Sequence, residues 1–352
     1  MNQAALFAQA LARLEPATRD AFLAAIRKTR SAAQLHLVIE HLKAGNIEAA
    51  IAATTFPSSF FFPLDKAVQD AFQVGAGLAM KEMGSLPPDP FSGSSISIAF
   101  DGRHPRAELW TQTASSALIT DVTEDQKAMA RTVIETGLAK GKGITEIARG
   151  LIGTAKPGTK ARTGGFIGIT QQQAQFALNM EDELNGQNMA NYFNRARRDK
   201  RYDKLVYRAM ETGQPIPAAK IEEIVGRYKD QLLALRGQTI ARTETLSALG
   251  AGRHEGYKQL LDSGAVHDSQ IKRTWDATLD KRTRLDHMIM NGKTVQGMEE
   301  PFVIPAGVHG PESRLMFPRD RSLEAPARET INCRCFETIE IDYLNGPGAA
   351  NG

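Results

Sequence analysis

The two cysteines of the chain, Cys333 and Cys335, are separated by one residue near the C-terminal end. Together with His287 they could hold a zinc ion, because two thiolates and one imidazole are a legitimate tetrahedral ligand set. The candidates for a fourth ligand are Asp280, His254, His267 and His309. Structural zinc sites usually keep at least two residues between paired cysteines, so the spacing here weakens the metal interpretation. Free cysteine is among the most buried residue types. We therefore expect two buried thiols and no metal or other cofactor, with zinc at His287, Cys333 and Cys335 as the alternative.

Residues 331–341 alternate in a way that predicts a β-strand containing both cysteines. On such a strand Cys333 and Cys335 would face the same side as Ile339 and Ile341. Their side chains would project in parallel, so a disulfide between them is unfavourable. The cysteine usage therefore gives no indication of an oxidising compartment.

A second constellation consists of Asp280, Arg282, Arg284 and His287. It could be a catalytic group in which a carboxylate orients a histidine, or a network of charge-assisted hydrogen bonds that fixes a loop. We favour the structural interpretation, because no nucleophile stands at a recognisable position beside these residues. The sequence therefore predicts no catalytic residue, and we expect the protein not to be an enzyme.

The elements that must position these residues are mostly helices. We predict a mainly α fold, in which a bundle of long helices is joined to a small C-terminal α+β domain. The proline-rich stretch 86–90 cannot continue a helix and sets the first boundary. The expected regions are an N-terminal helical region at 1–90, a central region of long helices at 91–262, the C-terminal domain at 263–345 and a disordered tail at 346–352.

Local signals in the central region predict individual helices. Thr123 with Gln126, and Thr170 with Gln173, have the spacing of a capping box, which predicts a helix start at each threonine. Apolar residues also repeat at helical spacing over 218–235.

The C-terminal domain has its own signals. Residues 271–275 alternate as a strand, and 283–288 are long enough for one or two helical turns. Asn291-Gly292 predicts a type I′ hairpin between 288–290 and 293–295.

Composition bounds the class of protein. The chain has 352 residues, 42% of them hydrophobic, and a formal net charge of +3. This is enough for two or three folded domains, but the charge is too small to identify the whole chain as a nucleic-acid binder. No apolar run reaches the roughly 18 residues that span a bilayer, and the N-terminus lacks the pattern of a secretory signal. We expect no membrane association and a location in the cytoplasm where the protein is made.

Positive charge is concentrated in the basic segment between Arg195 and Arg208, which contains only two acidic residues, Asp199 and Asp203. Tyr202 and Tyr207 lie among the cations, so base stacking with phosphate contact is one interpretation. A solvated helix face is the other. The candidate nucleic-acid contacts are Arg195, Arg197, Arg198, Lys200, Arg201, Lys204 and Arg208.

An ordered series of residues near the C-terminus resembles the phage Mu F-type head morphogenesis family. The series comprises Trp275, Asp280, Arg282, Arg284, His287, Asn291-Gly292, Phe317-Pro318-Arg319-Asp320 and Asn332-Cys333-Arg334-Cys335. A weaker match is Ile240-Ala241-Arg242-Thr243-Glu244-Thr245, which is similar to the family's helix leading into its terminal domain. We interpret Arg242 and Glu244 as a strut between that helix and the domain. The resemblance covers about 265–340, and residues before about 90 resemble the family only loosely.

The resemblance implies a minor head protein of a tailed bacteriophage. Such a protein associates with the portal vertex and acts in head morphogenesis, with DNA packaging or delivery as a further role. The implied partners are the portal protein, capsid or scaffold proteins and packaged DNA. The implied location is the virion, in the capsid interior or at the portal vertex, and the host cytoplasm during assembly.

The competing interpretation is a metal-dependent DNA-processing enzyme. His287 and Asn291 would belong to a nuclease site of the ββα-metal type, with the cysteines holding a structural zinc. Such a site normally needs another histidine shortly after the asparagine, and the next one is His309. The minor head protein is therefore the preferred hypothesis.

Overall fold

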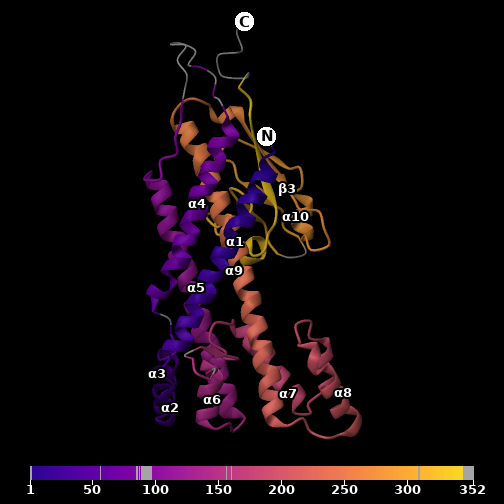
Figure 1. Ribbon diagram of the computed structural model, residues 1–352. Helices are drawn as coiled ribbons and strands as arrows, with labels where there is room; N and C mark the ends of the chain where they lie inside the picture. The colour runs from indigo at the N-terminus through magenta and orange to yellow at the C-terminus, as the bar shows by residue number, and fades with distance from the viewer. Residues whose placement is uncertain are drawn as a thin grey trace. The chain divides into compact units, whose positions relative to one another are not determined.

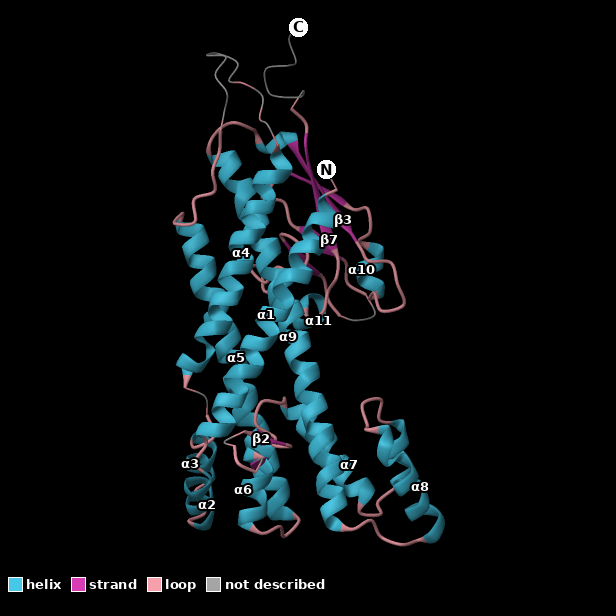
Figure 2. Ribbon diagram, in the orientation of Figure 1, coloured by secondary structure: helices cyan, strands magenta, loops and turns pink. Residues whose placement is uncertain are grey.

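The computed structural model describes residues 2–55, 57–84, 86, 88, 97–155, 157–159, 161–307 and 310–343. The described chain is mainly helical, with short strands gathered largely in the C-terminal part (Figures 1 and 2). The predicted fold class, mainly α with a small α+β part, is confirmed. The expected boundary at Pro90, the tail at 346–352 and the candidate ligand His309 lie outside the described residues.

Helices account for most elements. The α-helices are α1 (Gln3–Ala32), α2 (Leu35–Lys43), α3 (Ile47–Ala52), α4 (Phe62–Met83), α5 (Pro105–Ala139), α6 (Ile144–Ile152), α7 (Gln171–Leu184), α8 (Asp203–Thr212), α9 (Ala218–Asp262), α10 (Leu285–Ile289) and α11 (Ala327–Thr330). Short 3₁₀ helices are η1 (Ser58–Phe61), η2 (Met189–Asn194), η3 (Lys200–Tyr202) and η4 (Asp268–Gln270). The strands are β1 (Thr154–Ala155), β2 (Arg162–Thr163), β3 (Ile271–Asp276), β4 (Thr294–Gln296), β5 (Phe302–Ile304), β6 (Ser313–Leu315) and β7 (Phe336–Ile341).

The chain folds into two compact units, each discontinuous in sequence. Unit 1 comprises Met1–Arg19, Leu64–Ser115 and Thr239–Gly352, and unit 2 comprises Asp20–Pro63 and Ser116–Gln238. The long helices α1, α5 and α9 contribute residues to both units. Unit 1 therefore draws on all three regions expected from the sequence and contains the C-terminal α+β part.

In unit 1, α4 and α9 pack closely because glycines face backbone atoms. A Cβ atom on Gly252 would lie 1.9 Å from the carbonyl oxygen of Phe72, and one on Gly75 would lie 2.2 Å from that of Leu249. Any larger residue at these positions would force the helices apart. The α1 residue Phe7 is buried in a cluster with residues of both helices, including Leu249.

The α+β part of unit 1 is built on an antiparallel sheet with the strand order β4-β3-β7. In this sheet Trp275 pairs with Glu337, and a separate hairpin joins β5 to β6. One core contains Ile339 and residues of α4 and α9. A second core contains Trp275, Cys333 and Cys335 together with residues of β5 and β6.

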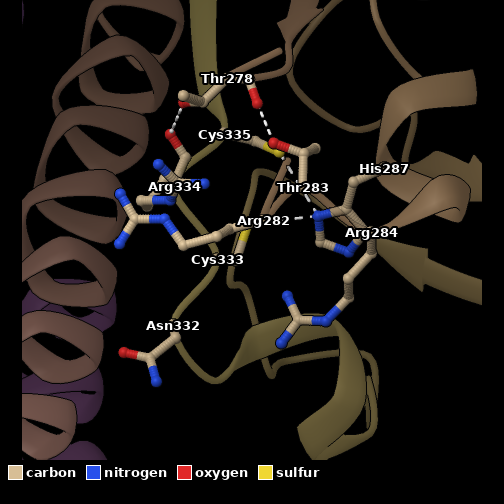
Figure 3. Close-up of a pocket in the computed structure, with 9 residues that line it drawn as sticks. All are labelled: Thr278, Arg282, Thr283, Arg284, His287, Asn332, Cys333, Arg334 and Cys335. Carbon is tan, nitrogen blue, oxygen red and sulfur yellow. Dashed lines mark hydrogen bonds between the residues drawn. The ribbon is translucent and has the colours of Figure 1, made fainter. Parts of the chain in front are cut away.

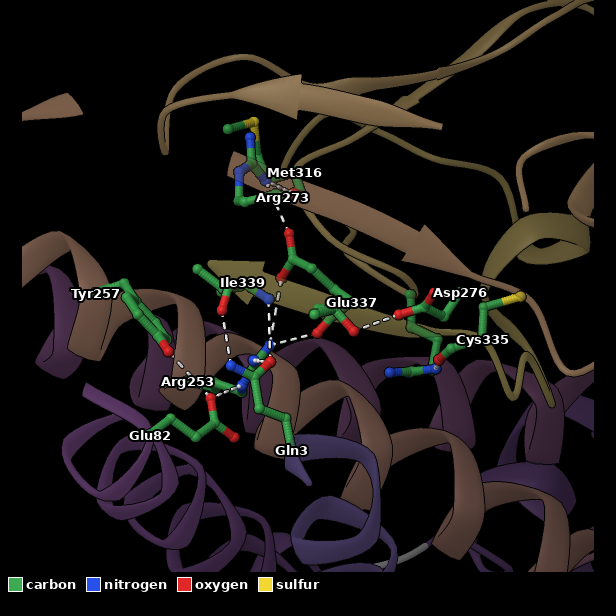
Figure 4. A network of polar contacts seen from close by, with 12 residues as sticks. Gln3, Glu82, Arg253, Tyr257, Arg273, Asp276, Met316, Cys335, Glu337 and Ile339 are labelled. Carbon is green, nitrogen blue, oxygen red and sulfur yellow. Dashed lines mark hydrogen bonds and ion pairs between the residues drawn. The ribbon is translucent and has the colours of Figure 1, made fainter. Parts of the chain in front are cut away.

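A buried polar network around Arg253 connects α9 to three other elements of unit 1 (Figure 4). The Arg253 guanidinium lies 2.7 Å from Oε2 of Glu82 on α4 and donates to the carbonyl oxygen of Glu337 on β7 at 2.7 Å. It also donates at 2.7 Å to Oε1 of Gln3 on α1, and the Gln3 amide donates to the carbonyl oxygen of Ile339 at 2.7 Å. Because these groups are buried, their mutual satisfaction is required for the packing of β7 on the helices.

Unit 2 uses buried arginines to hold the segment between α6 and α7. Arg30 donates to the carbonyl oxygens of Ile167 at 3.0 Å and Gly165 at 2.8 Å, and its charge is paired with Asp230.

The next helix, α7, begins with the predicted capping box. Thr170 accepts from the backbone N–H of Gln173 while the Gln173 side chain accepts from the backbone N–H of Thr170.

The capping box predicted at Thr123 is wrong. Thr123 lies inside the continuous helix α5. Its hydroxyl donates to the carbonyl oxygen of Ile119 at 2.8 Å, one turn earlier, which is the alternative use of threonine within a helix. The same sequence spacing therefore has two structural outcomes in this chain.

The prediction of a β-hairpin at Asn291-Gly292 is also wrong. Residues 288–290 belong to α10 and its C-cap, so the turn joins a helix to β4. Gly292 has a φ of +77°, whereas Asn291 does not adopt the positive φ that a type I′ turn requires.

In the described part of the chain, none of the helices combines the length and apolar character that crossing a bilayer requires.

Candidate functional site

Three side chains of soft-metal-ligand type converge in unit 1 (Figure 3). The Nδ1 atom of His287 on α10 lies 3.4 Å from Sγ of Cys333 and 3.4 Å from Sγ of Cys335. The other ring nitrogen, Nε2, lies 2.8 Å from Oε2 of Glu329 on α11. All four residues are buried, each at most 3% exposed. The site is therefore a buried cluster of two thiols, an imidazole and a carboxylate.

The cysteines lie in a loop before β7, so the predicted strand over 331–341 is wrong for 331–335. Asn332 has a left-handed φ of +55°, which turns the chain between α11 and β7. Its backbone N–H donates to the hydroxyl of Thr243 on α9 at 3.1 Å. This turn directs both cysteines at His287 and into a different core from that of Ile339.

Arg319 supports the loop from the opposite side. Its side chain is 1% exposed, and its Nη1 donates to the carbonyl oxygens of Cys333, at 3.3 Å, and Cys335. Nη1 is also 4.0 Å from Sγ of Cys333. The guanidinium therefore fixes the loop backbone and places positive charge beside the sulfurs.

The surroundings shift the pKa values of both cysteines and of His287. The hydrogen bond from Cys335, assisted by His287 and the Arg319 charge, lowers the pKa of Cys333 well below its usual value although burial opposes this. The same contact with Cys333, together with burial, raises the pKa of Cys335. Burial alone would lower the pKa of His287, but its contacts with Cys333 and Glu329 outweigh burial and raise it. The surroundings therefore favour the thiolate form at Cys333 over Cys335.

The cluster opens onto a small pocket with a basic rim. Its wall contains Thr278, Arg282, Thr283, Arg284, Asn332 and Arg334, in addition to His287 and the cysteines. Arg334 pairs with Asp280 through two contacts of 2.6 Å, which hold the pKa of Asp280 well below its usual range. Asp280 also accepts from the backbone N–H of Arg282 at 2.8 Å. The carboxylate therefore fixes this loop, and its hydrogen bonds go to Arg334 and Arg282 and not to His287.

The structure brings together only some of the proposed metal ligands. Among the described residues, the group of converging ligands contains His287, Cys333 and Cys335 and none of the proposed fourth ligands. His254 is packed against Phe317, and its burial lowers its pKa well below the usual value. His267 is exposed beside η4. Sequence reasoning missed Glu329, because nothing in its spacing marks it as the partner of His287.

Arg242 and Glu244, the two residues proposed as a strut, lie on α9 and contact other parts of unit 1. Glu244 forms an ion pair of 3.0 Å with Arg321, in the segment that precedes α11, and Arg242 pairs with Glu15 at 3.2 Å. These contacts have the geometry of the strut proposed for Arg242 and Glu244.

The basic segment of unit 2 begins at the C-cap of η2, continues through η3 and ends in α8, so it does not form one helix face. Three of its cations are paired within unit 2: Arg195 with Glu183, Arg198 with Asp203 and Arg201 with Asp199. The exposed cations for which no acidic partner occurs among the described residues are Arg197, Lys200, Lys204 and Arg208. The charge available to nucleic acid is therefore smaller than the sequence suggests.

Comparison with known proteins relates the C-terminal part of the chain to phage proteins. Residues 200–338 match the family described as phage Mu protein F like protein. The uncharacterized protein YqbB of Bacillus subtilis is 34% identical over 144 residues, which are 40% of this chain and 41% of that protein. The NAD(+)–arginine ADP-ribosyltransferase EFV of Enterococcus faecalis is 36% identical over 120 residues, which are 34% of this chain and 20% of that protein. The aligned region thus spans less than half of either relative, and no solved structure matches the chain significantly.

These matches confirm the resemblance noted in the sequence. The chain contains a phage Mu F-like domain over residues 200–338.

Proposed function

We propose that the protein, which carries a phage Mu F-like domain over residues 200–338, is a minor head protein of a tailed phage. It associates with the portal vertex and acts in head morphogenesis, and it contacts DNA during packaging or delivery. It is located in the virion, at the portal vertex or in the capsid interior, and in the host cytoplasm during assembly. The family match carries this proposal.

A structural rather than catalytic role is supported by how the motif residues are used. Both ring nitrogens of His287 have buried partners, and Asp280 is committed to Arg334. Asn291, the other residue of the nuclease alternative, accepts from the backbone N–H of Ala277 at 3.0 Å. A general base must reach its substrate, so these contacts favour a non-enzymatic protein. We do not propose for this protein the transferase activity named for the Enterococcus relative, because the alignment covers only a fifth of that relative.

Helix α10 offers a surface for a protein partner. Leu285, Met288 and Ile289 have the spacing of one helical face and are 55%, 41% and 56% exposed. Exposed apolar side chains gathered in this way are typical of protein interaction sites. We assign this surface, defined by Leu285, Met288 and Ile289, to the portal protein.

Copy number in particles tests the proposed function. Quantitative mass spectrometry of purified virions and assembly intermediates should find a few copies per particle. Hundreds of copies, or none in either kind of particle, would refute a minor head protein.

A portal pull-down tests the assigned surface. The double variant Leu285→Ser/Ile289→Ser should lose portal binding, while the control Leu109→Ser/Leu323→Ser, which also removes exposed apolar side chains, should retain it. Equal binding by both variants would show that the α10 surface is not the contact. Failure of the unmodified protein to bind portal or procapsid would count against portal association itself.

A further inference from the structure

We propose that His287, Cys333 and Cys335 form a zinc site, in which the cysteine sulfurs and Nδ1 of His287 are three ligands and a water molecule from the adjoining pocket is the fourth. This departs from the sequence-based expectation of two simply buried thiols. That expectation assumed a strand, on which the side chains would be parallel. The loop geometry after Asn332 removes the objection, because it directs both sulfurs at one imidazole nitrogen.

The distances fit a tetrahedral ion. With Zn–S near 2.3 Å and Zn–N near 2.0–2.1 Å, tetrahedral angles place nitrogen and sulfur ligands roughly 3.6 Å apart. Both observed nitrogen–sulfur distances are 3.4 Å, and the three ligand atoms lie within 4.8 Å of one another. Only small side-chain movements are needed to complete the coordination geometry.

The hydrogen bond of His287 to Glu329 leaves the Nδ1 atom of the imidazole able to bind a metal. A carboxylate accepts a hydrogen bond, so the 2.8 Å contact with Glu329 places the imidazole proton on Nε2. The Nδ1 lone pair then faces the two sulfurs. Carboxylate–histidine pairs of this kind recur beside zinc, where they orient the ring and raise its basicity. Arg328 Nε lies 2.8 Å from the other carboxylate oxygen of Glu329 and supports its negative charge.

The surroundings also suit thiolate ligands. Trp275 is fully buried, and its indole N–H, which has no other partner among the described residues, lies beside Cys335. This donor is available to a thiolate on Cys335. Two thiolates would balance the charge of a divalent ion, so the occupied site is neutral in a buried place where net charge is unfavourable. Thiolate and imidazole ligands together are typical of zinc.

The fourth position is open on the pocket side. His287, Cys333 and Cys335 all contribute to the pocket wall, and the described residues supply no fourth protein ligand there. The carboxylate of Asp280 is bound to Arg334 in the pocket wall. A water molecule is therefore the ligand that the pocket can deliver.

Metal analysis of the intact chain tests the site. Protein purified under reducing conditions and reconstituted with zinc should contain about one zinc per chain, and both thiols should be protected from a thiol reagent until a chelator is added. Cobalt in place of zinc should give thiolate-to-metal charge-transfer absorption. A metal-free protein with two freely reactive thiols after reconstitution would overturn the proposal.

Matched variants assign the ligands. Cys333→Ser and Cys335→Ser should each lose the bound metal, and Glu329→Gln should bind zinc about 10- to 100-fold more weakly. His267→Gln, at a position that the sequence offered as a fourth ligand, should keep full stoichiometry. Zinc retained by a double Cys→Ser variant, or lost from this control, would refute the ligand set. If a cysteine variant does not fold, the cobalt absorption of the unmodified chain still decides whether thiolates bind the ion.

Discussion

Replacement of Arg253 by methionine should destabilise unit 1 by about 3–5 kcal/mol, because it removes one partner of a buried ion pair. The side chains of Arg253 and Glu82 are 2% and 0% exposed, and their closest contact is 2.7 Å. Without Arg253, the Glu82 carboxylate would keep only the Tyr257 hydroxyl, at 3.1 Å, and its Oε1 already has no partner among the described residues. The variant also loses the hydrogen bonds to Gln3 and to the Glu337 carbonyl.

Urea unfolding followed by tryptophan fluorescence measures this loss directly. The two tryptophans, Trp110 and Trp275, both belong to unit 1, so their signal follows that unit. The double variant Arg253→Met/Glu82→Met should be more stable than Arg253→Met alone, because it leaves no unpaired buried charge. Lys66→Met is the control on α4, since Lys66 and Asp70 form an exposed pair that contributes at most about 1 kcal/mol. A loss below about 1 kcal/mol for Arg253→Met, or a double variant less stable than the single one, would refute the reasoning.

Two further perturbations test other parts of the molecule. Trp275→Ala should cost about 3–5 kcal/mol and lower solubility and particle assembly together, since Trp275 is fully buried against His287 and Phe302; a well-folded variant that had selectively lost a hydrolytic activity on DNA would contradict this. Lys229→Met should stabilise unit 2 at pH 7, because burial lowers the pKa of Lys229 from 10.5 to about 8. Below pH 8 the cost of burying the charge, up to about 3 kcal/mol, is fully present, and it is relieved as the pH rises to 10.5. Thermal unfolding by circular dichroism should therefore show a variant more stable at pH 7 but not above pH 10.5, and equal stabilities at pH 7 would contradict this assignment.

Helices with a long apolar period could be predicted from the sequence, because burial along one face is a local pattern. The α9 residues Ile221, Ile224 and Val225 illustrate this, since all three are buried as their spacing indicates. Capping signals were less decisive. Thr170 begins α7 whereas Thr123 lies within α5. A hydroxyl can bond to a free amide or to a carbonyl one turn earlier, and only the surrounding packing selects between them.

The candidate site was predicted in its residue types but not in its geometry. His287 and the two cysteines were proposed together, yet the strand assumed for residues 331–335 concealed their convergence. The left-handed φ of Asn332 produces the convergence, and alternation along the sequence carries no signal for it. Glu329 was missed for a different reason. Charged residues usually lie at the surface, so a single sequence gives no sign that this carboxylate is buried against His287.

The two sequence motifs of the family resemblance are far apart in the chain but contribute to one packing arrangement. On α9, Thr243 accepts from the backbone of Asn332, Glu244 pairs with Arg321, and Arg253 holds the β7 backbone. The contact with Asn332 fixes the cysteine loop itself, and the other two fix the segment before α11 and the strand that follows the loop. A zinc ion bound to this segment would add a further constraint at the position where Asn332 reverses the chain. The motif residues thus stabilise the C-terminal α+β part from within, and this leaves exposed surfaces such as the α10 face to contact a partner.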